Sequence, residues 1–273
     1  MDSDKPLLFP EKKVTNYPLY FYRVFGKILA LSFFAVGTIL LAALCFPICK
    51  LIFRPKTKFR YHTRYLIYIL FNGFIKVLWA LRLLKVKVDK KDVLSNLKSA
   101  IVVANHSAYL DSFVMLGLLK HATIIPKASL SETNVMKLVI NELYTPNSVP
   151  FDEIVERIKE DFDNGNTLIM FPEGTRSTPY GQNHYKKGAA RISLKTGVPI
   201  IPVYIGGNSK KGLGKGDKLF EYNHSSIYSF DLHIKEPVYP DEFKDLPEPI
   251  AAKRLTHKIR DVLSDEANAQ YRY

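Results

Sequence analysis

The chain has 273 residues, and its 39 Lys and Arg residues against 26 Asp and Glu residues give a formal net charge of +13. The length suits one large domain or two small ones, and an apolar fraction of 47% excludes a chain that is disordered throughout. Two cysteines exclude a framework of disulfides and a zinc site made of four cysteines.

The excess of positive charge lies in one segment. Residues 50–98 hold thirteen basic and two acidic side chains, whereas residues 99–273 hold twenty-one of each. A protein that binds nucleic acid needs positive charge on its globular part, and here that part is neutral. The distribution therefore favours an anionic membrane surface as the partner of the basic segment and argues against nucleic acid.

An apolar run precedes the basic segment, because residues 28–49 contain no charged side chain. At about 1.5 Å per residue, a helix of this length crosses a hydrocarbon core of roughly 30 Å. The basic residues that follow predict that the side carrying Lys50 is cytoplasmic. We expect a transmembrane helix in a bacterial inner membrane, with the domain on the cytoplasmic side; a monotopic, re-entrant arrangement is the open alternative.

Two further stretches belong to this amino-terminal part, which we expect to comprise residues 1–84. Residues 50–64 interleave basic and aromatic side chains, a combination that suits lipid head groups. Residues 65–84 are apolar but contain Lys76 and Arg82, so they predict a helix that lies in the interface or packs on the domain.

The domain is expected to comprise residues 85–273, where short apolar runs alternate with amphipathic segments. The predicted strands are 100–104, 122–126, 167–171, 199–205 and 226–235. The predicted helices are 111–120, 131–143 (capped by Ser131), 152–163, 185–196 and 250–264. This order predicts an α/β fold, a largely parallel sheet with flanking helices, in which ligands bind beyond the carboxyl ends of the strands. The glycine-rich stretch 206–217 is expected to be the most flexible loop.

A histidine and an aspartate five positions apart follow the first predicted strand, in the sequence NHSAYLD. On a regular helix, residues five apart point about 140° away from each other, so these side chains meet only if His106 lies in the loop and Asp111 in the first turn of the helix. An Asp–His contact fixes the imidazole tautomer and makes the other ring nitrogen a general base. The alternative is a surface histidine and an aspartate that caps a helix.

A second motif, FPEGTRS, follows the predicted strand 167–171. Gly174 allows a sharp turn that exposes backbone N–H groups, and Arg176 offers a planar fork for a phosphate or carboxylate. Glu173 is placed to hold Arg176 or a substrate hydroxyl. The alternative is an ordinary turn with a surface ion pair.

Together with VPIIPV at residues 198–203, these motifs resemble three motifs of the glycerolipid acyltransferases, in the same order and at similar spacing. That family includes the 1-acylglycerol-3-phosphate acyltransferases. The resemblance covers residues 85–240 and implies a membrane-bound O-acyltransferase of phospholipid biosynthesis.

The resemblance also implies roles for individual residues. His106 of the HX4D motif would deprotonate a hydroxyl of a lysophospholipid such as 1-acyl-glycerol-3-phosphate, with Asp111 orienting the imidazole. The hydroxyl would attack an acyl thioester of coenzyme A or acyl carrier protein, without a cofactor. The residues that would line the acceptor site are Glu173, Gly174, Thr175 and Arg176.

The sequence departs from the family at one place. An Asp/Asn-Arg pair usually lies between the two catalytic motifs, whereas Asn147 here is followed by Ser148. We expect Lys127, at the end of the strand 122–126, to supply the missing contact with the acceptor. The other basic candidates are Lys186, Lys187 and Arg191.

This departure leaves a different hydroxylated lipid open as the acceptor, and a non-catalytic lipid-binding protein of the same fold is the further alternative. No serine lies in a Gly-x-Ser-x-Gly elbow, which argues against a hydrolase nucleophile. The remaining histidines form no ligand cluster in the sequence, so we expect no metal.

Overall fold

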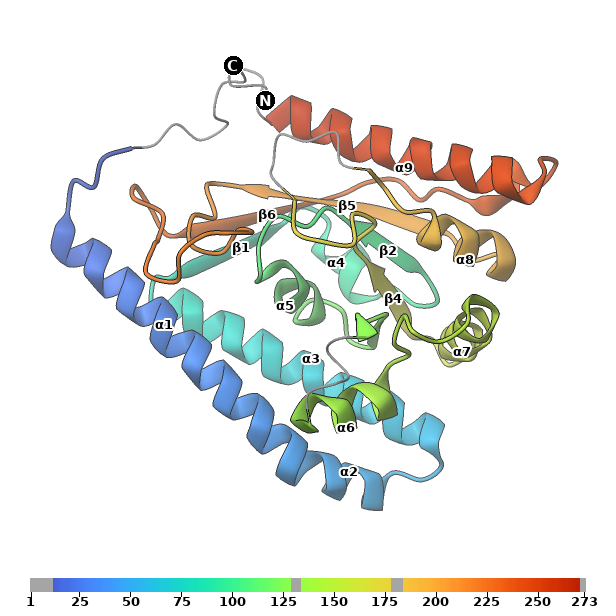
Figure 1. Cartoon of the computed structure of the whole chain (residues 1–273), viewed down its shortest axis with the longest axis horizontal. Helices are drawn as coiled ribbons and strands as arrows, with labels where there is room; N and C mark the ends of the chain where they lie inside the picture. Colours follow the sequence, from blue (N-terminus) through green and yellow to red (C-terminus); the bar gives the residue numbers. More distant parts are fainter. Residues whose placement is uncertain (1–11, 129–133, 178–183, 271–273) are drawn as a thin grey trace.

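The computed structural model describes residues 12–128, 134–177 and 184–270. Its core is a six-stranded sheet with the order β1-β6-β5-β2-β4-β3, in which every neighbouring pair is parallel except β5 and β6. The strands are β1 (Leu84–Val88), β2 (Ile101–Ala104), β3 (Ala122–Ile124), β4 (Thr167–Met170), β5 (Ile200–Gly207) and β6 (Tyr228–Ile234). The predicted α/β fold with a largely parallel sheet is therefore confirmed (Figure 1).

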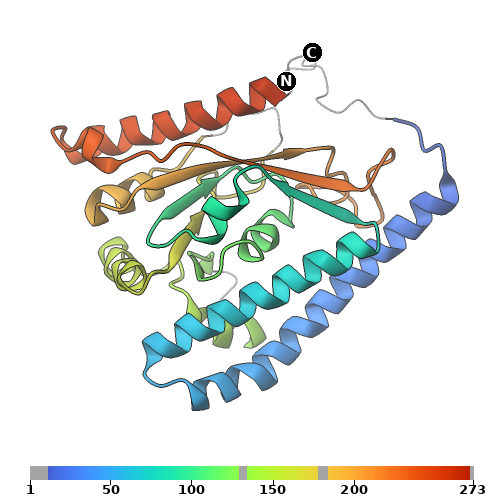
Figure 2. The same ribbon diagram turned by 180° about the vertical axis from the view of Figure 1, so that it is seen from behind.

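Helices cover both faces of this sheet, which explains why its central strands are continuous apolar runs. Along β2, Val102 and Ala104 face α1, α3 and α5, whereas Ile101 and Val103 face α7, α8 and α9 (Figures 1 and 2). The helices are α1 (Tyr17–Leu40), α2 (Phe46–Ile52), α3 (Lys56–Ala80), α4 (Lys91–Ser95), α5 (Asp111–Leu116), α6 (Asn134–Leu143), α7 (Phe151–Asp163), α8 (Gly188–Thr196) and α9 (Glu248–Gln270).

Each predicted strand and helix of the domain has a counterpart in the structure, although the expected start of one helix at Ser131 lies outside the described residues. Sequence reasoning misses α4 and the edge strand β1. In β1, Val86 and Val88 pack against the core while Lys85 and Lys87 alternate with them. This half-polar strand pairs with β6 in the folded chain, a partner about 140 residues away that no local pattern reveals.

The amino-terminal part forms a helical hairpin on one side of the domain (Figure 1). Together α1, the π-helical turn η1 (Leu41–Cys45) and α2 make one continuous helix, Tyr17–Ile52, of 36 residues. In the described part of the chain, this is the one helix that is long and apolar enough to cross a membrane. α3 runs back beside it and packs on α5, where Gly117 permits a close approach because a Cβ there would lie 2.6 Å from Ile75.

Part of the basic segment contacts the domain instead of facing outward. Arg64 is buried, and its guanidinium binds Asp161 of α7 at 2.6 Å and the carbonyl oxygen of Leu143 at 2.6 Å. Arg60 is also buried, and its Nε donates to the carbonyl oxygen of Glu142 at 3.0 Å. The interpretation that all these basic residues lie at lipid head groups is therefore wrong for Arg60 and Arg64, which hold α3 on the domain.

Candidate active site at the ends of β2 and β4

Both sequence motifs leave neighbouring strands at the same edge of the sheet. Because β2 and β4 are paired in parallel, the segments that follow them, 105–110 and 171–177, meet beyond their carboxyl ends. Several hydrogen bonds join these segments: the Ser177 N–H donates to the His106 carbonyl oxygen at 2.8 Å, the Ser177 hydroxyl lies 3.2 Å from the same oxygen, and the His106 N–H donates to Glu173 Oε2 at 3.2 Å. The sheet topology thus makes one site of the two motifs.

His106 and Asp111 are in contact, with His106 Nδ1 lying 3.0 Å from Asp111 Oδ2. His106 lies in the loop and α5 begins at Asp111, as the five-residue spacing requires. Asp111 is fully buried, and the same oxygen accepts the N–H groups of Ser107 and Ala108 at 2.7 and 2.8 Å. The carboxylate is therefore fixed by the loop itself, independently of the imidazole.

The imidazole of His106 is oriented from two sides. The Asp111 carboxylate is an acceptor only, so we assign the proton to Nδ1, and Nε2 is then the basic nitrogen. The ring also stacks on Phe171, with centroids 4.5 Å apart and planes 29° apart. With 16% of its side chain exposed, His106 is an oriented imidazole that a substrate can reach.

Asn105 supports the histidine from the strand that precedes it. Its Oδ1 accepts the Ile205 N–H at 2.6 Å, and its Nδ2 donates to the Ile205 carbonyl oxygen at 3.0 Å. The side chain thereby continues the pairing of β2 with β5 by one step and fixes the backbone just before His106. Sequence reasoning gives Asn105 no role. The one feature of the sequence that could indicate its role is the position of an amide side chain directly after a buried strand.

Glu173 holds the two motif loops together. Its Oε2 accepts the hydroxyl of Ser177 at 2.5 Å in addition to the His106 N–H. Burial raises the pKa of the Glu173 carboxyl above its ordinary value, and the hydrogen bonds from Ser177 and His106 oppose that rise. Of the two partners expected for Glu173, Arg176 is not the one it binds; in the described structure the carboxylate faces Ser177 and His106.

Gly174 and Thr175 form the outer part of the turn. Gly174 has φ +68°, a conformation that strongly favours glycine, so the sharp turn expected at this position is present. Thr175 is exposed. Thr175 therefore faces solvent at the outer end of the turn.

Arg176 extends toward the glycine-rich loop. Its Nη1 donates to the carbonyl oxygens of Leu213 at 3.3 Å and Gly214 at 2.9 Å, and its guanidinium lies 3.4 Å from the ring centroid of Tyr109. One edge of the guanidinium is thus engaged, and the Tyr109 ring fixes its plane. Tyr109, part of the first motif, is a site residue whose contact the sequence does not reveal.

The glycine-rich stretch expected to be the most flexible loop is extensively hydrogen-bonded. Asp217 Oδ2 accepts the N–H groups of Gly212 and Gly214, both at 2.8 Å. Lys27 of α1 donates to the carbonyl oxygens of Gly212 at 3.2 Å and Glu221 at 2.5 Å. Side-chain donors and acceptors therefore hold this loop, and Lys27 links it to the amino-terminal helix.

Lys210 is a partly buried cation at the base of this loop that sequence reasoning does not single out. Its Nζ donates to the carbonyl oxygens of Gly206, Asn208 and Ser229 at 3.2, 2.7 and 2.6 Å. Burial lowers the pKa of Lys210 to about 8, although the negative charges of Asp111 and Asp231 oppose this effect. Lys210 therefore adds positive charge near the buried carboxylate behind His106.

Lys127 lies beyond β3, at the same edge of the sheet as the two motifs. It is exposed, and hydrogen bonds of Asn147 fix the residues on either side: the Asn147 N–H donates to Pro126, and its side chain accepts the Ala128 N–H at 2.8 Å. Within the described residues, no contact joins Lys127 to His106 or to the Glu173 turn. Its predicted role in acceptor binding stays a prediction.

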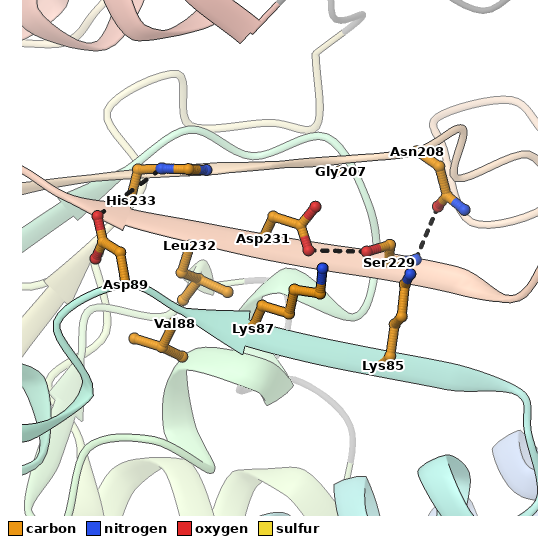
Figure 3. A pocket seen from close by; sticks show the side chains of 10 residues that line it. All are labelled: Lys85, Lys87, Val88, Asp89, Gly207, Asn208, Ser229, Asp231, Leu232 and His233. Atoms are coloured by element: carbon orange, nitrogen blue, oxygen red, sulfur yellow. Dashed lines mark hydrogen bonds and ion pairs between the residues drawn. The ribbon is translucent and has the colours of Figure 1, made fainter.

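The lysines of the edge strand line a separate surface pocket. Figure 3 shows Lys85 and Lys87 of β1 beside Ser229 and Asp231 of β6. This pocket shares none of its lining residues with the two motifs. Across residues 12–128, 134–177 and 184–270, no group of His, Cys, Asp or Glu side chains is arranged to hold a metal ion.

Comparisons with known proteins give the site a context. The family model described as Acyltransferase matches residues 85–206, which include both motifs and β5. A crystal structure of the 1-acyl-sn-glycerophosphate acyltransferase of Thermotoga maritima is similar over 92% of this chain and 99% of that chain, with a TM-score of 0.66 and 25% sequence identity.

Relatives with curated names are similar over shorter regions. A chloroplastic 1-acyl-sn-glycerol-3-phosphate acyltransferase of Brassica napus is 31% identical over 51% of this chain and 44% of its own length. A probable 1-acyl-sn-glycerol-3-phosphate acyltransferase of Mycoplasma genitalium is 28% identical over 62% of this chain and 65% of its own length. The match thus spans less than two thirds of either relative.

Proposed function

We propose that the chain is a member of the glycerolipid acyltransferase family and that it transfers an acyl group from a thioester to a hydroxyl of a lysophospholipid such as 1-acyl-glycerol-3-phosphate. The observation that carries the proposal is the contact between His106 and the buried Asp111 at the carboxyl edge of the sheet. The names of the relatives support the acceptor class, and the geometry supports the chemistry.

In the proposed reaction, His106 Nε2 accepts the proton of the acceptor hydroxyl as the hydroxyl oxygen attacks the thioester carbonyl carbon. Asp111 stabilises the imidazolium that forms, because its buried carboxylate already faces Nδ1. Collapse of the tetrahedral intermediate breaks the carbon–sulfur bond, and the imidazolium returns its proton to the leaving thiolate. The products are an ester and a free thiol, carried by coenzyme A or by acyl carrier protein.

The acceptor is proposed to bind at the turn of residues 173–177. Thr175 is exposed there. One edge of the Arg176 guanidinium binds the carbonyl oxygens of Leu213 and Gly214, and the Tyr109 ring fixes the plane in which the other edge lies. A guanidinium whose plane is fixed in this way suits the oxygen atoms of a phosphate.

We further propose that the enzyme lies on one leaflet of a membrane, with Tyr17–Ile52 along the surface. Near its start this helix contacts the domain through Lys27, and near its end through Lys50, which pairs with Glu142 at 2.8 Å. A helix of 36 residues is about 54 Å long, well beyond a hydrocarbon core of roughly 30 Å, and a spanning helix would separate its two ends. The monotopic arrangement is consistent with contacts to the same domain at both ends.

A product assay tests the proposed activity. Purified protein in mixed micelles is incubated with acyl-coenzyme A or acyl carrier protein thioester and with lysophosphatidate, other lysophospholipids or monoacylglycerol, and the products are identified by mass spectrometry. The proposal predicts phosphatidate from lysophosphatidate. Acylation of another acceptor alone would assign a different substrate, and no acylation of any acceptor would favour a non-catalytic lipid-binding protein.

A further inference from the structure

A lysine outside both motifs lies against the acceptor turn. Lys186 precedes α8, and its backbone N–H donates to the carbonyl oxygen of Pro172 at 2.8 Å, which pins it beside the turn. Its side chain covers the bare backbone of Gly174, with Nζ 2.8 Å and Cε 2.9 Å from the position that a Cβ of Gly174 would occupy. The absence of a side chain at Gly174 therefore makes room for the Lys186 ammonium.

The Lys186 ammonium group is available for a ligand, unlike the guanidinium of Arg191. In the part of the chain that the structure describes, no carboxylate or carbonyl oxygen accepts a hydrogen bond from Lys186 Nζ. By contrast, Arg191 pairs with Glu248 and lies 3.9 Å from the ring centroid of Phe151. Of these two cations, Lys186 is therefore the one that contacts the acceptor turn and has no ion-pair partner among the described residues.

We propose that Lys186 binds the phosphate of the acceptor together with Arg176 and sets the preference for an anionic acceptor. This role rests on the proposed function. Without Lys186, the positive charge of Arg176 is offset by the carboxylate of Glu173 within the same turn. A phosphate monoester carries about −1.5 to −2 charges at neutral pH, so it gains from a second cation. Lys186 takes the place of the arginine that the sequence lacks after Asn147.

The adjacent lysine provides a matched control. Lys187 is equally a surface lysine before α8, but its side chain lines a different pocket with Lys253, His257 and Arg260 of α9. Replacement of either lysine by glutamine removes one charge from neighbouring positions of the sequence. A general effect of net charge on binding to micelles or membranes therefore acts on both variants alike.

The test compares steady-state kinetics of the wild type, Lys186→Gln, Lys186→Arg and Lys187→Gln. Lysophosphatidate and uncharged monoacylglycerol serve as acceptors. For Lys186→Gln we expect the KM for lysophosphatidate to rise about tenfold or more, because one charge-assisted hydrogen bond is lost. The KM for the acyl donor and the rate with monoacylglycerol should stay unchanged, Lys186→Arg should recover most of the loss, and Lys187→Gln should stay within about twofold of wild type.

Three results would overturn the inference. An unchanged KM for lysophosphatidate in Lys186→Gln, with the wild type active, would remove Lys186 from the site and leave the proposed function intact. An equal loss with both acceptors would assign Lys186 to folding or to the reaction itself. A wild type that acylates neither acceptor would overturn the proposed function and, with it, this inference. Thermal unfolding checks each variant, and because the Lys186 side chain is exposed we expect unchanged midpoints.

Discussion

At the scale of single residues, the two carboxylates of the site differ in what they hold. Asp111 is buried behind His106, and one of its oxygens accepts two backbone N–H groups besides facing the imidazole. Glu173 instead binds Ser177 and the backbone of His106, so it fastens one loop to the other. The first carboxylate orients the His106 imidazole, and the second holds the two motifs together.

Asp111→Asn tests the orienting role. An asparagine oxygen can still accept the N–H groups of Ser107 and Ala108, so the loop should be retained, but the negative charge that stabilises the imidazolium is lost. We expect kcat to fall by about 10²–10⁴-fold with little change in KM. The new amide nitrogen is buried, which should lower the free energy of unfolding by about 1–3 kcal/mol. A variant with near wild-type kcat would show that Asp111 serves the fold alone.

Lys210 predicts a dependence of stability on pH. The pKa is lowered by burial to about 8 from 10.5, so between these values the unfolded chain binds more protons than the folded protein. The free energy of unfolding should therefore rise as the pH increases through this window, by roughly 3 kcal/mol for a shift of this size. Chemical denaturation of wild type and Lys210→Met across the window checks this, and equal pH slopes in the two proteins would contradict it.

At the scale of elements, the sequence predicts where the motifs meet but not what holds their surroundings. The spacing allows His106 to pair with Asp111 only at a strand-to-helix turn, where the structure places them, and the two motifs meet because parallel strands end at one edge of the sheet. The carbonyl partners of Arg176, and Asn208 among the partners of Lys210, lie on a loop whose composition indicates flexibility. Contacts between side chains and distant backbone groups leave no periodic signal, so this part of the site requires the structure.

The contact between α3 and α7 gives a prediction about stability. Arg64→Met leaves the carboxylate of Asp161 buried without its partner, which should lower the free energy of unfolding by about 3–5 kcal/mol. Replacement of both residues, Arg64→Met with Asp161→Leu, should recover much of that loss, because an apolar pair has no charge to desolvate. Lys58→Met, at an exposed position of the same helix, is the control. Similar free energies of unfolding for Arg64→Met and Lys58→Met would show that the buried ion pair contributes little.

At the scale of the whole molecule, part of the basic excess behind the net charge of +13 is used in contacts with the domain. Arg60 and Arg64 hold α3 on the domain, and Lys85 and Lys87 belong to the sheet. The exposed surface of α1 is largely apolar. Its exposed side chains include Phe21, Phe25, Leu29, Phe33, Val36 and Leu40.

This apolar face predicts how the protein partitions into vesicles. Phe25 and Phe33 are 67% and 75% exposed, so replacing both with serine should leave folding unchanged. Each lost phenylalanine removes roughly 2 kcal/mol of favourable transfer, and the partition coefficient into anionic vesicles should fall by at least about tenfold. Tyr239→Ser, at an exposed aromatic beside α8 and α9, should have no effect on flotation with vesicles. If the double phenylalanine variant and Tyr239→Ser lost vesicle binding equally, the membrane contact would lie elsewhere.

The proposed role of His106 as the base of acyl transfer is tested by the rate of thiol release in His106→Ala. His106 contributes its imidazole to a loop that Asp111 and Glu173 fix through backbone N–H groups, so this variant should fold and bind vesicles as the wild type does. If His106 is the base, acceptor-dependent thiol release should fall by at least about 10²-fold in this variant. Turnover close to that of the wild type, in a folded variant at saturating acceptor and thioester, would contradict it.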